Sequence, residues 1–323
     1  MNGSDSSAPA GAGPIVVASQ LGSAFAHILG AAGLDVRVHD QHTPPWMVDP
    51  DVNVVVTQPK CWVGAPAEQP AGWPGAVRFI QLGSAGIDGY PAWMFNGPVV
   101  ATSRGVAAPP ISEYVLTAML TVAKEFDRLA VTGPEQWKAR RLGGLYGARL
   151  GLVGYGAIGE AVATRARAFG MKVSALRRRG GVAMDGVEPA GSVAELAATC
   201  DHLVLALPLT PESRRIVNRA ALMGAKPGLH LINISRGGLV DQEALLEALD
   251  HGPVGFATLD VTEPEPLPAG HIFYSHPKIR LTPHISWADS DTQVRLGEKA
   301  AANIRAFAAG RQPQDVVVAG AAY

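Results

Sequence analysis

Short runs of aliphatic and β-branched residues alternate with alanine-rich stretches along almost the whole chain. Such runs are typical of buried strands, and the stretches between them have helical spacing. Strands that alternate with helices form a parallel sheet with crossover helices. In the first third of the chain the predicted strands are Pro14–Val17, Val36–Val38, Val52–Val56, Val77–Ile80 and Val99–Val100. The sequence therefore predicts an α/β fold.

The alternation restarts at about Arg149, which indicates a second sheet. Its predicted strands are Leu150–Val153, Lys172–Ala175, Leu203–Ala206, Leu229–Ile234, Phe256–Leu259 and Ile279–Leu281. A chain of 323 residues is long enough for two domains, at roughly 100–200 residues each. We expect two doubly wound parallel-sheet domains.

Two predicted helices indicate how the domains are connected. Ile111–Phe126 follows two prolines, which suit a helix start, and its apolar residues recur at three- and four-residue spacing. Asp289–Ala308 is also helical in pattern, and we expect it to return to the first domain. We therefore predict a discontinuous first domain, residues 1–108 with 289–323, and a second domain, residues 109–288.

Charge and cysteine content exclude several classes of protein. Lys and Arg number 27 against 28 Asp and Glu, so we expect no basic surface for nucleic acid or anionic membranes. The two cysteines, Cys61 and Cys200, are too few for a disulfide framework or a cysteine zinc site, and we predict no metal site. No charged residue stands between Asp5 and Asp35, where a secretory signal would need basic residues. We expect a cytoplasmic protein with a loose tail over residues 1–13.

A glycine-rich loop, Gly154-Tyr-Gly-Ala-Ile-Gly159, follows the predicted strand Leu150–Val153 and begins a helix. In such a unit the first glycine makes the tight turn, the second lets the backbone approach a pyrophosphate, and the third allows the helix to pack closely on the strand. The N–H groups at the helix start then hold the phosphates. The pattern predicts a dinucleotide site, with a plain tight turn as the alternative.

The residues at the next strand end indicate which dinucleotide binds. NAD-specific sites place Asp or Glu about 20 residues beyond the glycine loop, where it accepts hydrogen bonds from the ribose. Here the strand Lys172–Ala175 is followed by Leu176 and then by Arg177-Arg178-Arg179. Guanidinium groups can bind the 2′-phosphate of NADP, which a carboxylate would repel. We predict a preference for NADPH carried by Arg177 and Arg178, with NAD as the second candidate; a solvated basic turn is the alternative.

Five motifs occur in order and resemble the successive signatures of the D-isomer-specific 2-hydroxyacid dehydrogenases. They are Gly151–Gly159, Leu207–Ser213, Asn233–Gly237, Leu259–Pro266 and Thr282–Ile285. Two earlier segments, Gly83–Asp88 and Ile111–Glu113, are similar to the family's substrate loop and hinge helix. The resemblance extends over nearly the whole chain and is greatest to glyoxylate/hydroxypyruvate reductases.

This resemblance implies a fold, a reaction and an assembly. The fold is a Rossmann dinucleotide-binding domain and a flavodoxin-like substrate domain, with the active site in the cleft between them. The reaction is hydride transfer from a nicotinamide to a small 2-keto acid, which gives the D-2-hydroxy acid. The assembly is a homodimer. The implied cofactor contacts, with Asp260 on the nicotinamide carboxamide, are Gly154, Tyr155, Gly156, Ala157, Ile158, Gly159, Leu207, Pro208, Ser213, Ile234, Ser235, Arg236, Asp260 and His284.

A histidine and a carboxylate are candidates for the proton transfer. His284 follows the predicted strand Ile279–Leu281, and imidazole titrates near working pH, so His284 suits the role of proton donor. Glu265 resembles the family's carboxylate partner, which would favour the protonated imidazole. Glu263, two residues earlier, is the competing candidate.

The substrate carboxylate has two candidate binding groups. Arg236 follows a predicted strand, and its planar guanidinium matches the two oxygens of a carboxylate, although a surface salt bridge is the alternative. The turn formed by Ser84, Ala85 and Gly86 would offer backbone N–H groups to the same carboxylate, with a simple glycine turn as the alternative.

Three tryptophans and two other functions stay open. Trp287 stands where the family has small residues, and it either narrows the pocket or packs against the last helix. Trp62 and Trp137 are candidates for the pocket wall, with core or dimer contacts as the alternative.

Two other functions are compatible with the fold that the resemblance implies. They are a dinucleotide-sensing corepressor-like protein and a phosphite dehydrogenase. The presence of all three candidate catalytic residues, Arg236, Glu265 and His284, favours a 2-keto acid reductase.

Overall fold

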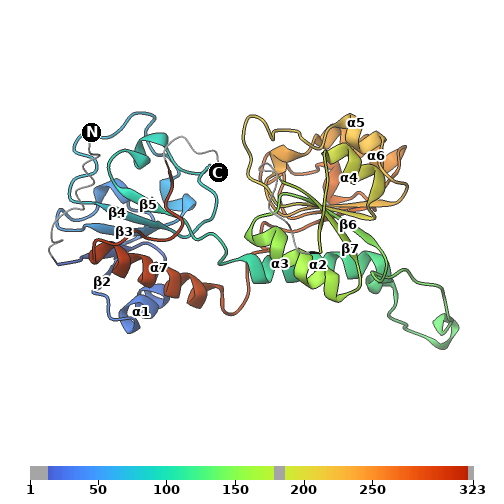
Figure 1. Cartoon of the computed structure of the whole chain (residues 1–323), viewed down its shortest axis with the longest axis horizontal. Coiled ribbons are helices and arrows are strands. Elements are labelled where there is room, and N and C mark those ends of the chain that lie inside the picture. The colour runs from blue at the N-terminus through green and yellow to red at the C-terminus, as the bar shows by residue number, and fades with distance from the viewer. Residues whose placement is uncertain (1–13, 178–185, 319–323) are drawn as a thin grey trace, which may run out of the picture. The chain divides into compact units, whose positions relative to one another are not determined.

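The chain divides into two compact units in a computed structural model that describes residues 14–177 and 186–318. The first unit comprises Met1–Val106 and Ser290–Tyr323, and the second comprises Ala107–Asp289 (Figure 1). The chain therefore passes between the units twice. The predicted tail over residues 1–13 lies outside the described residues.

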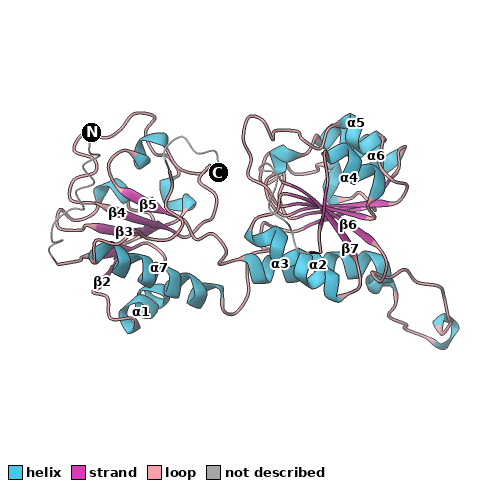
Figure 2. Cartoon of the chain, viewed as in Figure 1, coloured by secondary structure: helices cyan, strands magenta, loops and turns pink. Residues whose placement is uncertain are grey.

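The first unit contains one parallel sheet of five strands (Figure 2). They are β1 (Val17–Ser19), β2 (Val36–Val38), β3 (Val54–Thr57), β4 (Phe79–Leu82) and β5 (Val99–Ala101). The order β2-β1-β3-β4-β5 is that of a flavodoxin-like sheet. Helices α1 (Ser23–Ala31) and α7 (Thr292–Ala308) pack against each other and share a core with the sheet. This confirms the fold class predicted for the first part of the chain.

Aromatic residues form a second core in this unit. Trp62 is 3% exposed and lies within 6.0 Å, between ring centroids, of Trp46, Trp73 and Trp93. Its indole N–H donates a hydrogen bond to the Thr57 hydroxyl over 3.0 Å. Trp62 is therefore a core residue, which was the alternative to a place in the pocket wall.

The second unit contains a parallel sheet of seven strands. They are β6 (Arg149–Val153), β7 (Lys172–Leu176), β8 (Glu188–Pro189), β9 (His202–Leu205), β10 (Leu229–Asn233), β11 (Val254–Leu259) and β12 (Ile279–Leu281). The order β12-β11-β10-β9-β6-β7-β8 is the Rossmann order with one added strand, as expected.

Helices cover both faces of this second sheet (Figure 1). One face packs against α2 (Ala108–Lys124) and α3 (Ala157–Ala168). The other face packs against α4 (Val193–Thr199), α5 (Arg219–Met223) and α6 (Gln242–Asp250). Two apolar layers therefore bury the strands from both sides, as a doubly wound fold requires.

The predicted strand boundaries in the first unit were displaced. Strand β1 begins at Val17 rather than Pro14, and β4 begins at Phe79 rather than Val77. Strands buried on both faces are apolar without alternation, so the apolar run does not show where hydrogen bonding starts. Helix α2 likewise begins at Ala108, three residues before the predicted start, with both prolines in its first turn.

Two histidines lie inside the second sheet. The Nδ1 atoms of His202 and His230 are 3.1 Å apart, and Nε2 of His230 is 2.9 Å from the Thr258 hydroxyl. Burial lowers the pKa of His202 from 6.5 to about 4. Burial, followed by the charge of His202, lowers the pKa of His230 well below its usual value. Both imidazoles are therefore neutral in the folded protein at neutral pH.

This pair predicts a loss of stability in acid. The unfolded chain binds protons to both histidines near pH 6.5, whereas the folded chain binds one at His202 only near pH 4. The free energy of unfolding should therefore fall as the pH drops from about 6.5 to about 4, by about 3 kcal/mol for His202 alone. Urea unfolding at several pH values from 6.5 to 4 measures this change in the free energy of unfolding.

Replacing the pair should remove that part of the pH dependence. The variant with His202→Gln and His230→Gln should be less stable at pH 7 and lose less stability between pH 6.5 and 4. His27→Gln, at an exposed position in the first unit, is the matched control. If the free energy of unfolding of the double variant falls as steeply between pH 6.5 and 4 as that of the wild type, His202 and His230 do not cause this pH dependence.

Candidate active site

The predicted site residues of the second unit follow the carboxyl ends of neighbouring parallel strands. Because parallel strands end at one edge of the sheet, these residues share that edge, where such folds bind ligands. Gly154 follows β6, Arg177 follows β7, Leu207 comes two residues after β9, Ile234 follows β10, Asp260 follows β11 and His284 comes three residues after β12.

The glycine loop has the geometry of a phosphate-binding turn. Gly154 has a φ of +103°, and a Cβ atom there would lie 2.3 Å from the Ala206 carbonyl oxygen. A Cβ atom on Gly159 would lie 2.5 Å from the Gly154 carbonyl oxygen. Helix α3 begins at Ala157, and its N-cap residue is Gly156, which has no side chain to cap the first N–H groups. These residues fit the pyrophosphate of a dinucleotide, which would bind to those N–H groups.

Arg177 lies beside this loop. Strand β7 pairs with β6 so that Leu176 is opposite Val153, and the Gly154 N–H donates to the Leu176 carbonyl over 2.9 Å. The next residue, Arg177, is exposed. Arg178 lies outside the described residues.

Asp260 forms the centre of the hydrogen bonding at this edge. Asp260 is buried, with only 1% of the residue exposed. Its Oδ1 atom accepts hydrogen bonds from the Thr282 hydroxyl at 2.6 Å and the Ile285 N–H at 2.9 Å, and Oδ2 accepts one from the Ser286 N–H at 2.9 Å. The backbone carbonyl of Asp260 accepts the His284 N–H at 2.9 Å. Asp260 therefore fixes the loop that carries His284.

His284 itself has an uncommon backbone and a carboxylate partner. Its φ is +50°, in the left-handed region that non-glycine residues rarely adopt. Its Nδ1 atom lies 2.7 Å from Oε1 of Glu265, and the two side chains are 40% and 42% exposed. The indole N–H of Trp287 donates to the His284 carbonyl over 2.8 Å. The imidazole thus has one nitrogen on a carboxylate, and the backbone of His284 is held at both its N–H and its carbonyl.

Glu263 has a different partner. Its carboxylate forms a bidentate pair with Arg214, with distances of 2.8 and 2.9 Å. The hydrogen bond and charge of Arg214 lower the pKa of Glu263. Of the two candidate carboxylates, Glu265 is the one in contact with His284.

Arg236 follows β10 and is half-buried. Its Nη1 atom donates to the Ser235 carbonyl over 2.7 Å, and its own carbonyl accepts the Asn233 side-chain amide over 2.8 Å. The Ser235 hydroxyl donates to the Leu207 carbonyl. The strand end that carries Arg236 is therefore tied to the end of β9.

Ser213 is built into its own loop. Its hydroxyl donates to the Pro208 carbonyl and accepts the Thr210 N–H, at 2.8 and 2.7 Å, and the residue is 7% exposed. These bonds shape the segment after β9, in which Leu207 is half-buried and Pro208 is exposed.

The predicted turn of the first unit follows β4. The Ser84 hydroxyl donates to the Gly86 carbonyl over 2.8 Å and lies 2.9 Å from the Tyr90 hydroxyl. Ala85 between them is exposed.

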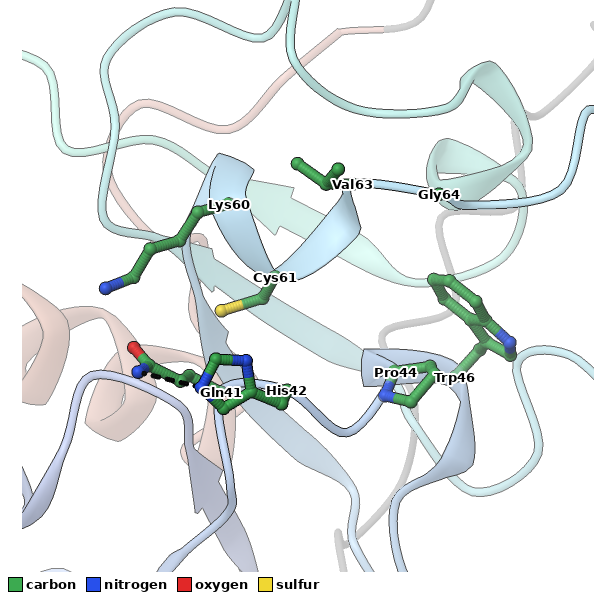
Figure 3. Close-up of a pocket in the computed structure, with 8 residues that line it drawn as sticks. All are labelled: Gln41, His42, Pro44, Trp46, Lys60, Cys61, Val63 and Gly64. Carbon is green, nitrogen blue, oxygen red and sulfur yellow. Dashed lines mark hydrogen bonds between the residues drawn. The ribbon is translucent and has the colours of Figure 1, made fainter.

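A cavity of about 440 Å³ lies elsewhere in the first unit, beyond the carboxyl ends of β2 and β3 (Figure 3). It is lined by Gln41, His42, Pro44, Trp46, Lys60, Cys61, Val63 and Gly64. Of the predicted site residues that the structure describes, none lines it.

The hydrogen bonds around Asp260 include two hydroxyl groups that the sequence analysis did not select, those of Thr282 and Tyr114. Thr282 donates to Asp260, and the Tyr114 hydroxyl lies 2.6 Å from that of Thr282. The place of Thr282 directly after a strand, within a motif, could have indicated it. Tyr114 is one residue of an apolar helix, and no sequence signal distinguishes it.

Within residues 14–177 and 186–318, no cluster of three His, Cys, Asp or Glu residues is placed to hold a metal ion. In the same ranges, no helix has both the length and the apolar character needed to cross a membrane.

Comparison with known proteins identifies the family. The family model described as D-isomer specific 2-hydroxyacid dehydrogenase, NAD binding domain, matches residues 116–286. Glyoxylate/hydroxypyruvate reductase A of Serratia proteamaculans is 32% identical over 255 residues, which cover 75% of this chain and 80% of that protein. Hydroxypyruvate reductase of Thermotoga maritima is 34% identical over 236 residues, which cover 68% of this chain and 74% of that protein.

A solved structure agrees with these relatives over nearly the full length. The D-isomer specific 2-hydroxyacid dehydrogenase family protein from Aeromonas salmonicida superposes with a TM-score of 0.81 at 25% identity and covers 95% of this chain and 99% of its own. The chain belongs to the D-isomer specific 2-hydroxyacid dehydrogenases, a family of nicotinamide-dinucleotide-dependent oxidoreductases.

Proposed function

We propose that this protein is an NADPH-preferring reductase that converts a small 2-keto acid to the D-2-hydroxy acid. The observation that carries this proposal is the pair formed by His284 and Glu265, with 2.7 Å between Nδ1 and Oε1. A reductase of this kind needs a proton donor at the ketone oxygen, and the pair can hold one. Relatives named as glyoxylate and hydroxypyruvate reductases support a small substrate.

The proposed proton transfer uses Nε2 of His284. The reduced nicotinamide, when bound, supplies the hydride to the carbonyl carbon. Because Nδ1 of His284 contacts the Glu265 carboxylate, Nε2 is left to face the substrate oxygen. The contact with the carboxylate orients the ring, so that an imidazolium can give its Nε2 proton to the developing alkoxide.

Substrate binding is assigned to Arg236 and to the turn of Ser84, Ala85 and Gly86. The Arg236 guanidinium can bind the substrate carboxylate through two hydrogen bonds and polarise the adjacent carbonyl. The turn would add backbone N–H groups to the same carboxylate.

Cofactor binding is assigned to the carboxyl edge of the second sheet. The glycine loop and the start of α3 would hold the pyrophosphate, and Asp260 would accept the carboxamide N–H of the nicotinamide. Arg177, together with Arg178, would bind the 2′-phosphate of NADP. The exposed position of Arg177 directly beside the loop supports this preference.

A homodimer is part of the proposal. The segment between α2 and β6, residues 125–148, extends away from the rest of the second unit (Figure 1). It carries Phe126, Trp137 and Tyr146, which are 69%, 81% and 89% exposed. Large apolar side chains exposed together on one segment are typical of an interaction surface. We assign this arm to a second copy of the chain.

The location follows from the cysteines. Cys61 and Cys200 are both free and buried. Unpaired thiols are typical of a reducing compartment, so we place the protein in the cytoplasm.

Substrate and cofactor are tested together in one assay. Oxidation of NADPH and of NADH is measured against glyoxylate, hydroxypyruvate, pyruvate and phenylpyruvate. We expect the highest kcat/KM with NADPH as cofactor and with either glyoxylate or hydroxypyruvate as substrate. Arg177→Ala should raise the KM for NADPH by about 10-fold, as expected for a lost charge-assisted contact, and that for NADH much less. An equal increase for both, or a wild-type preference for NADH, would exclude the assigned role of Arg177.

The catalytic pair is tested by three single substitutions. His284→Gln should lower kcat by about 10²–10⁴-fold, the usual contribution of a positioned general acid. Glu265→Gln should lower kcat by about 10-fold or more, because the imidazole loses the carboxylate that contacts Nδ1 and orients the ring. Glu263→Gln, whose carboxylate is paired with Arg214, is the matched control and should retain kcat within about 2-fold. A larger loss for Glu263→Gln than for Glu265→Gln would reverse the assignment.

The arm is tested by the oligomeric state. Trp137→Glu places a charge where the proposal needs an apolar contact, so the protein should shift from dimer to monomer in sedimentation at micromolar concentration. Ile272→Ser, at a 48% exposed apolar residue of the same unit, is the control and should stay dimeric. Dimers that persist in Trp137→Glu would show that another surface joins the subunits.

A further inference from the structure

A chain of two hydroxyl groups connects helix α2 to the buried carboxylate of Asp260. The Tyr114 hydroxyl lies 2.6 Å from the Thr282 hydroxyl, which donates to Asp260 Oδ1 over 2.6 Å. A threonine hydroxyl has one proton, and this proton is used on Asp260. The Tyr114 hydroxyl must therefore be the donor to Thr282.

The donor is fixed in its protonated form. Burial is the largest effect on Tyr114 and raises its pKa, and the Asp260 carboxylate adds to this. A phenol with a raised pKa keeps its proton at any pH at which the protein would work. The hydrogen bond from Tyr114 to Thr282 is therefore present throughout that range.

The chain of bonds ends on the loop that carries His284. Asp260 accepts the Thr282 hydroxyl and the Ile285 N–H on one oxygen and the Ser286 N–H on the other. A carboxylate that is fixed on both oxygens cannot rotate, so each bond to it helps to set the direction of the others. Loss of one donor should loosen the remaining two.

The position of these groups along the chain is also informative. Helix α2 begins at Ala108, directly after the chain enters the second unit, and the loop with Ser286 ends shortly before Asp289, where the chain leaves it. Tyr114 thus ties the first helix of the unit to its last loop. The last loop is bonded directly to the Asp260 carboxylate, and the first helix is linked to it through Thr282.

We propose that Tyr114 is a positioning residue, which acts through Thr282 to hold Asp260 and, with it, the loop 282–286 in the geometry that binds the nicotinamide and orients His284. This inference rests on the cofactor role assigned to Asp260 in the proposed function. It adds Tyr114 to that site as a residue that acts through the Thr282 hydroxyl.

The test is a double-mutant cycle. Tyr114→Phe keeps the ring and removes only the donor, and Thr282→Val removes the link to Asp260. The first readout is the Kd of the reduced dinucleotide that the wild type binds more tightly, measured by fluorescence. The second is hydrogen exchange at the Ile285 and Ser286 amides in the protein without added dinucleotide.

Coupling between the two positions is the expected result. Tyr114→Phe alone should raise the Kd by about 2- to 10-fold, the contribution of one net hydrogen bond, and should speed exchange at both amides. In the Thr282→Val background the same substitution should change neither, because the link is already lost. In the Thr282→Ser background, where the hydroxyl remains, the effect of Tyr114→Phe should return.

A matched control separates this role from general damage to α2. Thr117→Val removes a hydroxyl of the same helix that donates to the Glu113 carbonyl at 2.8 Å. It should leave the Kd and the exchange at Ile285 and Ser286 unchanged. Equal effects of Tyr114→Phe with and without the Thr282 hydroxyl, or no effect on either readout, would overturn the proposal.

The two readouts distinguish this proposal from the proposed function. If the protein reduces none of the 2-keto acids tested, binding and exchange are still measurable, and the cycle still decides the role of Tyr114. If exchange at Ile285 and Ser286 is coupled to Tyr114 while the Kd is not, the assigned role of Asp260 in cofactor binding is wrong and so is this inference.

Discussion

The carboxylate of Asp260 is the group on which the geometry of the candidate site depends. It is buried, and a buried charge is costly unless hydrogen bonds replace its water. Here the replacements are the Thr282 hydroxyl and the amides of Ile285 and Ser286, all from the segment on either side of His284. The same bonds that satisfy the charge therefore set the left-handed backbone of His284, which would otherwise relax to a common conformation.

The sheet explains why one carboxylate can have this effect. Strands β10, β11 and β12 are parallel neighbours, so Arg236, Asp260 and His284 come from adjacent strand ends. A backbone bond from the Asp260 N–H to the Asn233 carbonyl, at 3.0 Å, continues the ladder to the first residue after β11. The regular spacing of the strands thus fixes the approximate positions, and the hydrogen bonds around Asp260 fix the orientations.

Local patterns in the sequence were sufficient to predict the fold and the candidate residues. The glycine loop needs particular backbone angles, which only its residue types allow, and the structure has Gly154 at a positive φ. The choice between Glu263 and Glu265 could not be made from the sequence, because both stand in one loop and only the position of Arg214, 49 residues earlier than Glu263, separates them. Tyr114 could not be found because its partner Thr282 is 168 residues away. Contacts of that range depend on the packing of the whole unit.

The histidines of the second unit differ in the role they can play because their surroundings differ. His202 and His230 lie within the sheet, where burial lowers the pKa of each and leaves the pair bonded to each other and to Thr258. A histidine that cannot gain a proton at neutral pH cannot give one to a substrate. His284 has the same side chain at the edge of the same sheet, 40% exposed and beside the Glu265 carboxylate. An imidazolium has a donor on each ring nitrogen, so Nδ1 can donate to Glu265 while Nε2 donates to a ligand. Of these three histidines, His284 alone therefore combines access to a ligand with the means to carry a proton.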